Sequence, residues 1–266
     1  MKVLKDKVAV ITGAGGGIGS ALARKLASSG CHLALADRNT AALEITAASL
    51  EGHGVRVSQH SVDISLREQM AALPEAVIAQ HGQVNLLINN AGITYQKSFA
   101  NHSIEDWETI TGVNYWGVVY GCHYFLPALR DAGEAHIVNL SSMNALVGLP
   151  SQSSYCATKA AVKLLSESLW GELRPLGIGV TTVHPGAIRT DMMQATLDKA
   201  DDQKVAQKTY ALVQRIGMEP DKAAAKIITA VQRGRMRVRV GPDAVLVDIL
   251  KRCFPVGLHR LLARAG

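Results

Sequence analysis

An alternation of two residue patterns is the feature that most constrains the fold of this chain. Short β-branched, apolar runs are separated by segments with the 3.6-residue spacing of helices. Such an alternation builds βαβ units, so the sequence predicts an α/β fold with helices on both faces of a mainly parallel, seven-stranded sheet. The predicted strands are 8–12, 31–36, 55–59, 84–89, 136–140, 178–184 and 236–240, and the predicted helices are 18–29, 40–50, 65–81, 104–129, 155–173 and 220–232.

Length and composition are consistent with one large domain. The chain has 266 residues, of which 48% are hydrophobic and 19% charged, enough to bury a substantial core. We expect a domain over residues 1–241, with a polar, weakly helical lid at about 187–218. A basic, apolar tail over 242–266 is expected to pack on the domain, on a subunit interface or on a membrane surface. Four cysteines without CxxC spacing, and the lack of a long apolar run, favour a reducing, cytoplasmic location.

The first predicted strand runs directly into a glycine-rich loop, "TGAGGGIG" at residues 12–19. Glycines between a strand and a helix allow the backbone to approach a pyrophosphate, and the helix contributes free N–H groups and its positive dipole end. This context indicates a doubly wound fold of the Rossmann type with a nucleotide-like ligand. S-adenosylmethionine-dependent methyltransferases also place glycines after their first strand, so the loop alone leaves the ligand open.

An acidic residue, Asp37, ends the second predicted strand. A carboxylate there can accept hydrogen bonds from the adenosine ribose and would repel a 2′-phosphate, which favours NAD over NADP. The adjacent Arg38 keeps NADP as an alternative, because a guanidinium can bind that phosphate.

Tyr155 and Lys159 lie four residues apart in a predicted helix, in "YCATK". That spacing places both side chains on one helical face. The pair can be a phenol prepared for proton transfer, or ordinary helix surface.

Taken in order, these segments resemble the short-chain dehydrogenase/reductase family in its compact, single-domain form, from about residue 5 to residue 240. The motifs that carry the resemblance are "TGAGGGIG" at 12–19, "NNAG" at 89–92, Asn114, "VNLSS" at 138–142, "YCATK" at 155–159 and "HPG" at 184–186. The resemblance implies an oxidoreductase that interconverts a secondary alcohol and a ketone by hydride transfer to or from NAD or NADP.

The resemblance also implies roles for individual residues. Tyr155 would be the general acid/base, Lys159 its activator and ribose clamp, and Ser142 the group that orients the substrate oxygen. Asn114 would hold a water of a proton relay. Cofactor-binding residues would be Gly13, Gly15, Gly16, Gly17, Ile18, Gly19, Asp37, Arg38, Asp63, Ile64, Asn90, Ala91, Gly92, Tyr155, Lys159, Pro185, Gly186, Ile188 and Thr190.

The substrate pocket expected from the resemblance is mostly apolar. Its residues would be Ser142, Thr94, Met143, Ala145, Leu149, Gln152, Met192 and Met193, which fits a lipophilic alcohol or ketone. The two methionines can equally pack the lid onto the body. We expect no metal site, since the histidines are scattered. An NADP-preferring carbonyl reductase and a non-catalytic dinucleotide-binding regulator are the alternative functions.

The end of the chain is strongly basic. Residues 230–266 contain eight Lys or Arg and two acidic residues, and so carry the whole net charge of +6. The last predicted strand, "RMRVRVG", has an apolar face and an arginine face. Three interpretations remain open for the tail: packing at a subunit interface, contact with anionic lipid, and nucleic-acid binding. The first is favoured, with a homotetramer or homodimer implied by the resemblance; few aromatic residues argue against nucleic acid.

Overall fold

The computed structural model describes residues 1–265 and confirms the predicted sheet. Its seven strands have the order β3-β2-β1-β4-β5-β6-β7, and all neighbouring pairs are parallel. The strands are β1 (Val8–Thr12), β2 (His32–Asp37), β3 (Val57–Ser61), β4 (Leu86–Asn89), β5 (Ala135–Leu140), β6 (Ile178–Pro185) and β7 (Arg237–Val240). Each lies within two residues of its predicted bounds, because the short apolar runs mark them clearly.

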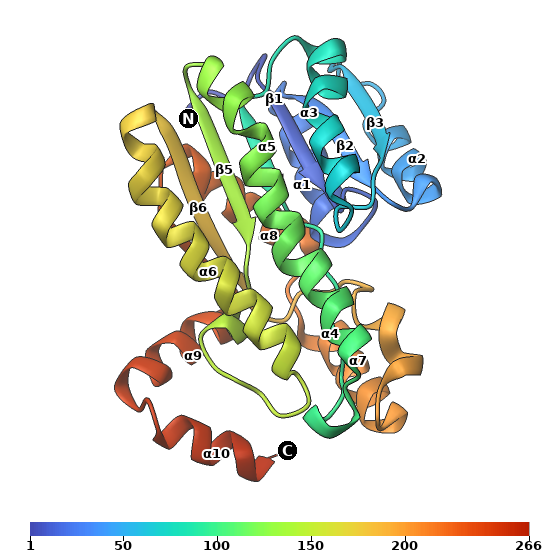
Figure 1. Cartoon of the computed structure of the whole chain (residues 1–266), viewed down its shortest axis with the longest axis vertical. Helices are drawn as coiled ribbons and strands as arrows, with labels where there is room; N and C mark the ends of the chain where they lie inside the picture. The colour runs from blue at the N-terminus through green and yellow to red at the C-terminus, as the bar shows by residue number, and fades with distance from the viewer. Residues whose placement is uncertain (266) are drawn as a thin grey trace.

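Helices cover both faces of the sheet (Figure 1). One layer contains α1 (Gly17–Ala27), α2 (Thr40–Ala48) and α8 (Pro220–Gln232). The other contains α3 (Arg67–His81), α5 (Gly117–Asp131) and α6 (Ser153–Leu173). Shorter helical segments are Phe99–Asn101, Met143–Ala145 and Arg174–Leu176.

The first strand shows why the runs are apolar throughout. Val8 and Val10 pack into a core cluster with α3, α5 and α6, whereas Ala9 and Ile11 pack with α1 and α8 on the other face. Successive side chains of a strand point to opposite faces, and here both faces are covered. All four side chains are fully buried.

The predicted helix over 104–129 is interrupted in the structure. It consists of α4 (Ile104–Thr111), a π-helical turn over Gly112–Trp116, and α5. The turn contains Asn114, which is completely buried. A one-turn change from i+4 to i+5 hydrogen bonding hardly alters the hydrophobic spacing, so the sequence pattern could not reveal it.

The segment predicted as a weakly helical lid contains a well-formed helix. It begins with a 3₁₀ helix, Gln194–Lys199, and continues as α7 (Gln203–Ile216). Asp201 connects it to the loop after β4, since its backbone N–H donates to the Gln96 carbonyl at 3.1 Å and its carboxylate accepts from the Ser98 N–H at 2.6 Å. The lid therefore lies across the carboxyl ends of the central strands (Figure 1).

The tail forms two helices, α9 (Pro242–Cys253) and α10 (Gly257–Ala265), shown in red in Figure 1. Asp248 of α9 is only 4% exposed and accepts hydrogen bonds from Arg237, Arg239 and Arg252. The arginine face of the edge strand β7 is therefore paired with the tail. No helix within residues 1–265 is both long and apolar enough to cross a membrane.

Candidate active site

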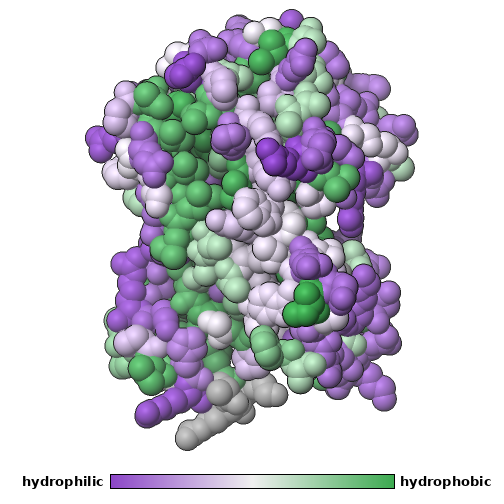
Figure 2. All heavy atoms as spheres, viewed as in Figure 1, coloured by the Kyte–Doolittle hydropathy of each residue, from purple (hydrophilic) through white to green (hydrophobic). Residues whose placement is uncertain are grey.

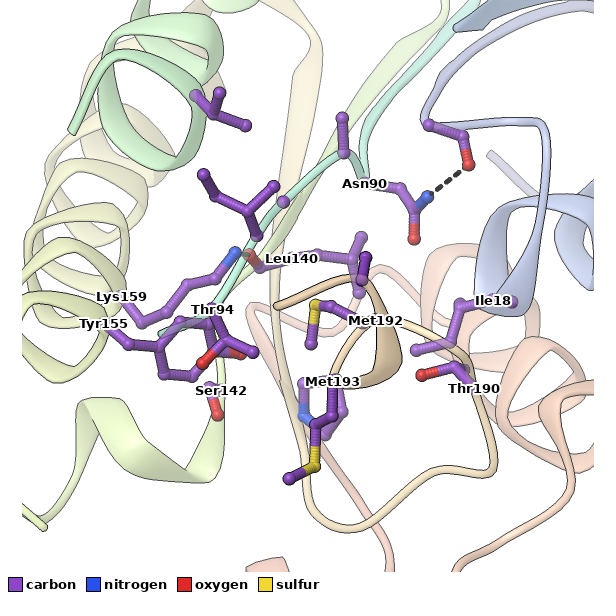
Figure 3. A pocket seen from close by; sticks show the side chains of 18 of the residues that line it. Ile18, Asn90, Thr94, Leu140, Ser142, Tyr155, Lys159, Thr190, Met192 and Met193 are labelled. Atoms are coloured by element: carbon purple, nitrogen blue, oxygen red, sulfur yellow. Dashed lines mark hydrogen bonds between the residues drawn. The ribbon is translucent and has the colours of Figure 1, made fainter. Parts of the chain in front are cut away.

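A cavity of about 680 Å³ opens at the carboxyl ends of the strands. Tyr155, Lys159 and Ser142 lie at one side of it, Ile18 and Thr190 lie at the other, and Met192 and Met193 project between them (Figure 3). Most of the residues predicted for the site line this cavity: Gly13, Gly16, Gly17, Ile18, Asp37, Arg38, Asp63, Ile64, Asn90, Ala91, Gly92, Thr94, Ser142, Met143, Leu149, Gln152, Tyr155, Lys159, Pro185, Gly186, Ile188, Thr190, Met192 and Met193.

Four predicted residues do not line the cavity. Gly15 lies behind Asp37, and Gly19 packs against the Gly13 carbonyl. Asn114 is buried beneath the wall, and Ala145 lies outside the lining. Gly15, Gly19 and Asn114 therefore support the shape of the site from behind.

The glycine loop has the geometry of a phosphate cradle. A Cβ added to Gly19 would lie 2.0 Å from the Gly13 carbonyl oxygen, and one added to Gly13 would lie 2.7 Å from the Ala91 Cα. Gly17 has φ +55°, where other residues are strained. The first turn of α1 has no side-chain cap, and Gly16, Gly17 and Ile18 face the cavity. An uncapped helix N-terminus beside open space fits the pyrophosphate of a dinucleotide.

Asp37 is held rigidly at the end of β2. Its Oδ2 accepts from the Gly15 N–H at 2.9 Å, and its Oδ1 accepts from the Asn39 N–H at 3.0 Å. An added Cβ on Gly15 would lie 3.0 Å from Oδ2, so the glycine is needed for this contact. Arg38 lines the cavity beside it. Both residues on which the cofactor prediction depends therefore face the adenosine side of the site.

The loop after β4 is fastened to the glycine loop. Asn90 Nδ2 donates to the carbonyls of Thr12 and Gly13, both at 3.0 Å, and its backbone N–H donates to the Thr12 hydroxyl at 3.1 Å. Nearby, Asp63 accepts from the N–H and hydroxyl of Ser65, which orients its carboxylate at the cavity wall. The "NNAG" motif thus acts by fixing backbone geometry.

Ser142 and Tyr155 meet where β5 ends and α6 begins. Ser142 Oγ accepts from the Asn144 N–H at 3.1 Å, and its side chain hydrogen-bonds with that of Tyr155. The neighbouring Ser141 instead donates its hydroxyl to the Lys159 carbonyl at 2.8 Å. Ser142, the serine predicted to orient the substrate oxygen, is therefore the one beside the phenol, and Ser141 is not.

Lys159 as the activator of Tyr155, acting together with an oxidised nicotinamide, stays a prediction. Burial raises the pKa of Tyr155 to about 12, and the hydrogen bond with Ser142 only partly opposes this. Burial lowers the pKa of Lys159 to about 8. Its Nζ donates to the Leu140 carbonyl at 2.9 Å and lies 5.8 Å from the centre of the Tyr155 ring. Sequence spacing places the two residues on one face but cannot show this desolvation.

Asn114, expected to hold a water of a proton relay, has a side chain that contacts protein groups at both ends of its amide. Its Oδ1 accepts from the Ile93 N–H, and its Nδ2 donates to the Ile93 carbonyl, both at 2.9 Å. A weaker bond joins Nδ2 to the Thr158 hydroxyl at 3.3 Å. Both ends of the amide are occupied by protein, so the side chain fixes the loop after β4. Any role in holding water would fall to the backbone of the π-helical turn.

The cavity wall also contains residues that sequence reasoning missed: Ile93, Tyr95, Thr109, Val113, Asn144, Ala187, Ala195, Lys199, Thr209 and Val213. Ile93 and Tyr95 follow "NNAG" directly, and their position after a strand end was a usable signal. Thr209 and Val213 lie on α7, and no sequence pattern showed which face of this helix is turned inward. Most of these side chains are apolar or uncharged.

Comparisons with known proteins agree with the geometry. The short chain dehydrogenase family matches residues 7–201. The chain is 39% identical to "Putative oxidoreductase SadH" of Mycobacterium tuberculosis over 99% of its length and 96% of that protein. "Probable oxidoreductase EphD" of Mycobacterium bovis is 34% identical over 96% of this chain and 44% of its own length.

Solved structures give the same result. A short-chain dehydrogenase/reductase from Burkholderia phymatum in complex with NAD has a TM-score of 0.88 and 32% identity, with 95% of each chain covered. A metagenomic short-chain oxidoreductase in complex with NADP has a TM-score of 0.73 and 27% identity, covering 90% of this chain and 99% of that one. This chain belongs to the short-chain dehydrogenase/reductase family and is an NAD(P)-dependent oxidoreductase.

Proposed function

We propose that the protein interconverts a secondary alcohol and a ketone on a lipophilic small molecule, with NAD preferred over NADP. One observation carries the proposal: a single cavity joins the uncapped glycine loop and Asp37 to the buried cluster of Ser142, Tyr155 and Lys159. The proposed dinucleotide site and the proposed proton-transfer site thus share one cavity. Catalysis of hydride transfer needs both in contact with the same substrate.

The protein groups divide the proton chemistry between them. When bound, the nicotinamide supplies the hydride or accepts it, and its oxidised ring brings a positive charge. Tyr155 holds the proton that the substrate oxygen gains or loses, and Ser142 orients that oxygen beside the phenol. With the pKa of Tyr155 raised to about 12 by burial, the phenol is protonated at neutral pH and is ready to act as a general acid toward a ketone.

Oxidation of an alcohol requires the phenolate. Lys159 is also fully desolvated, and its ammonium favours a nearby negative charge once the positive nicotinamide shares the site. The Leu140 carbonyl orients Nζ within the cavity wall. Lys159 is therefore placed to bind the nicotinamide ribose and to lower the pKa of the phenol in the loaded enzyme.

The preference for NAD is supported by the carboxylate of Asp37, which is fixed by two backbone N–H groups at the adenosine side. A 2′-phosphate on the adenosine ribose would lie close to this negative charge. Because the two hydrogen bonds hold the carboxylate in place, the phosphate would be repelled. Arg38 is the group that would favour the alternative, an NADP-preferring carbonyl reductase. Relatives of similar structure have been solved with each cofactor.

The substrate class is proposed from the character of the inner wall. Leu149, Met192, Met193 and Val213 contribute apolar surface around Ser142 and Tyr155. Met192 is 37% exposed, and Met193 is partly buried, which agrees with a role in adapting to a ligand as well as in packing the lid. A ketone carried on an aliphatic or alicyclic skeleton fits this wall better than a phosphorylated sugar.

A screen of secondary alcohols and ketones, with NADH and NADPH absorbance followed for both cofactors, tests the proposal. We expect turnover of lipophilic members with NAD or NADH at the higher kcat/KM. Cofactor binding without turnover of any alcohol or ketone would instead support the non-catalytic regulator. The buried Ser142–Tyr155 pair argues against that alternative, because a regulator has no need for it.

We further propose that the protein forms a homo-oligomer. For the tail, two binding partners are candidates. The apolar side chains Leu246, Ile249, Phe254 and Val256 are each at least 47% exposed on or beside α9. They can contact a second subunit, which we favour, or an anionic membrane, since Lys251 and Arg252 lie among them. Co-sedimentation with anionic vesicles separates the two, because a subunit contact leaves the protein in the supernatant.

A further inference from the structure

The tail helix α9 brings a carboxylate against a wall of the cavity. Asp243, in the first turn of α9, accepts a hydrogen bond from the Ala187 N–H at 2.6 Å. Ala187 follows β6, and together with Pro185 and Gly186 it lines the cavity. A residue beyond the expected boundary at 241 therefore holds a segment of the site.

Two glycines make room for this carboxylate. A Cβ added to Gly186 would lie 2.1 Å from an oxygen of Asp243, and one added to Gly241 would lie 2.3 Å from the other oxygen. Gly241 also has φ +117°, which other residues rarely adopt. Any side chain at either position would displace the carboxylate. The two turns are thus shaped around Asp243.

The two acidic residues of α9 have different electrostatic surroundings. Asp248 forms ion pairs with Arg237, Arg239 and Arg252. Among the ion pairs found in residues 1–265, none includes Asp243. The Asp243 carboxylate accepts from the Ala187 N–H and lies in the first turn of α9, near the positive end of the helix. It lies directly behind Gly186.

We propose that Asp243 is a positioning residue that fixes the Pro185–Ala187 segment and favours the oxidised over the reduced cofactor. The inference rests on the proposed function and on the family resemblance, which implies that Pro185, Gly186 and Ile188 back the nicotinamide. The oxidised ring carries a positive charge and the reduced ring carries none. A carboxylate behind the ring therefore stabilises the oxidised form selectively.

Asp243→Asn tests the proposal, because the amide keeps an acceptor for the Ala187 N–H and removes the charge. Kd values for NAD⁺ and NADH are measured separately by calorimetry, without substrate. We expect the ratio of Kd for NAD⁺ to Kd for NADH to rise about three- to tenfold, which is the range for a partly screened charge near the ring. Asp248→Asn is the matched control in the same helix: it should lower Tm and leave the ratio unchanged.

An unchanged ratio in Asp243→Asn would overturn the inference and reduce Asp243 to a first-turn carboxylate that stabilises α9. A change of the same size in Asp248→Asn would overturn it too, since general loosening of the tail would then explain the effect. Asp243→Ser, also uncharged and suited to a first turn, gives the same readout if the asparagine variant does not fold. Failure of the proposed function looks different: the wild-type protein would then bind neither cofactor, or would bind a cofactor without turnover of any alcohol or ketone.

Discussion

Tyr155 is subject to two opposing influences, and their balance depends on what shares the cavity. Burial raises its pKa to about 12, whereas Ser142 and an added positive charge lower it. The helical spacing of Tyr155 and Lys159 showed that the two could cooperate. It could not show that the ammonium is itself desolvated, because burial depends on the loop after β4 and on β5, which are distant in sequence.

Replacement of Tyr155 by phenylalanine should abolish turnover and preserve binding of the cofactor. The ring stays packed at 8% exposure, and only the hydroxyl that exchanges the proton is lost. We expect kcat to fall about 10²- to 10⁴-fold, which is the usual contribution of acid–base catalysis. The Kd for the cofactor should stay within about twofold of wild type. Steady-state kinetics on a confirmed substrate and calorimetric titration measure the two. Near wild-type turnover would show that another group moves the proton.

The position of Asp37 leads to a prediction about the choice between NAD and NADP. Asp37→Ala should weaken NAD binding about 10- to 150-fold, because a charge-assisted hydrogen bond contributes about 1.5–3 kcal/mol, and should remove the repulsion of a 2′-phosphate. The ratio of kcat/KM for NAD to that for NADP is the measurement. Asp37→Asn is a useful companion, since it keeps an acceptor for the Gly15 N–H. If neither variant changes the ratio, selectivity resides elsewhere.

At the scale of elements, sequence reasoning succeeded where one local rule decides the outcome. The strands were found because both faces of the sheet are covered, and helix α8 was placed at Pro220–Gln232 because a proline begins it and apolar spacing sustains it. The π-helical turn around Asn114, the length of the helix in the weakly helical lid and the pairing of Asp248 with β7 were missed. Each depends on contacts between segments far apart in the chain.

A buried histidine between β5 and β6 leads to a prediction about the stability of the fold at low pH. His136 of β5 is 2% exposed, and its Nε2 lies 2.7 Å from the Thr181 hydroxyl of β6. Burial lowers the pKa of His136 to about 3, below the ordinary value of 6.5. The unfolded chain therefore binds a proton first as the pH falls. The stability contributed by neutral His136 is complete above pH 6.5 and is lost progressively as the pH falls toward 3.

We expect His136→Gln to reduce the pH dependence of stability between pH 6 and 4. One titrating histidine contributes a slope of up to about 1.4 kcal/mol per pH unit, so its removal should lower the measured slope by about 1 kcal/mol per unit. Urea unfolding at several pH values gives the slope. The exposed His123 provides a control, since His123→Gln should leave the slope of stability against pH unchanged. Equal slopes in wild type and His136→Gln would contradict the assignment.

For the whole molecule, the surface over α5 and α6 is a second candidate, besides the tail, for the interface of the proposed homo-oligomer. Figure 2 shows hydrophobic residues gathered along α6 and toward α5. Leu164 is 60% exposed and Trp116 is 46% exposed, and Tyr120 stacks on Trp116 with ring centres 5.7 Å apart. Long apolar and aromatic side chains left in solvent on two neighbouring helices are typical of a protein–protein interface.

Leu164→Glu should therefore shift the oligomer toward smaller species. In a two-fold symmetric contact, one substitution introduces the charge twice, so the dissociation constant should rise by at least about tenfold. Light scattering coupled to size-exclusion chromatography, over a range of protein concentrations, measures the mass. Ile45→Glu is the control, because Ile45 is 73% exposed on α2, in the opposite helical layer. If Ile45→Glu dissociates the oligomer and Leu164→Glu does not, the α5–α6 surface is not the interface.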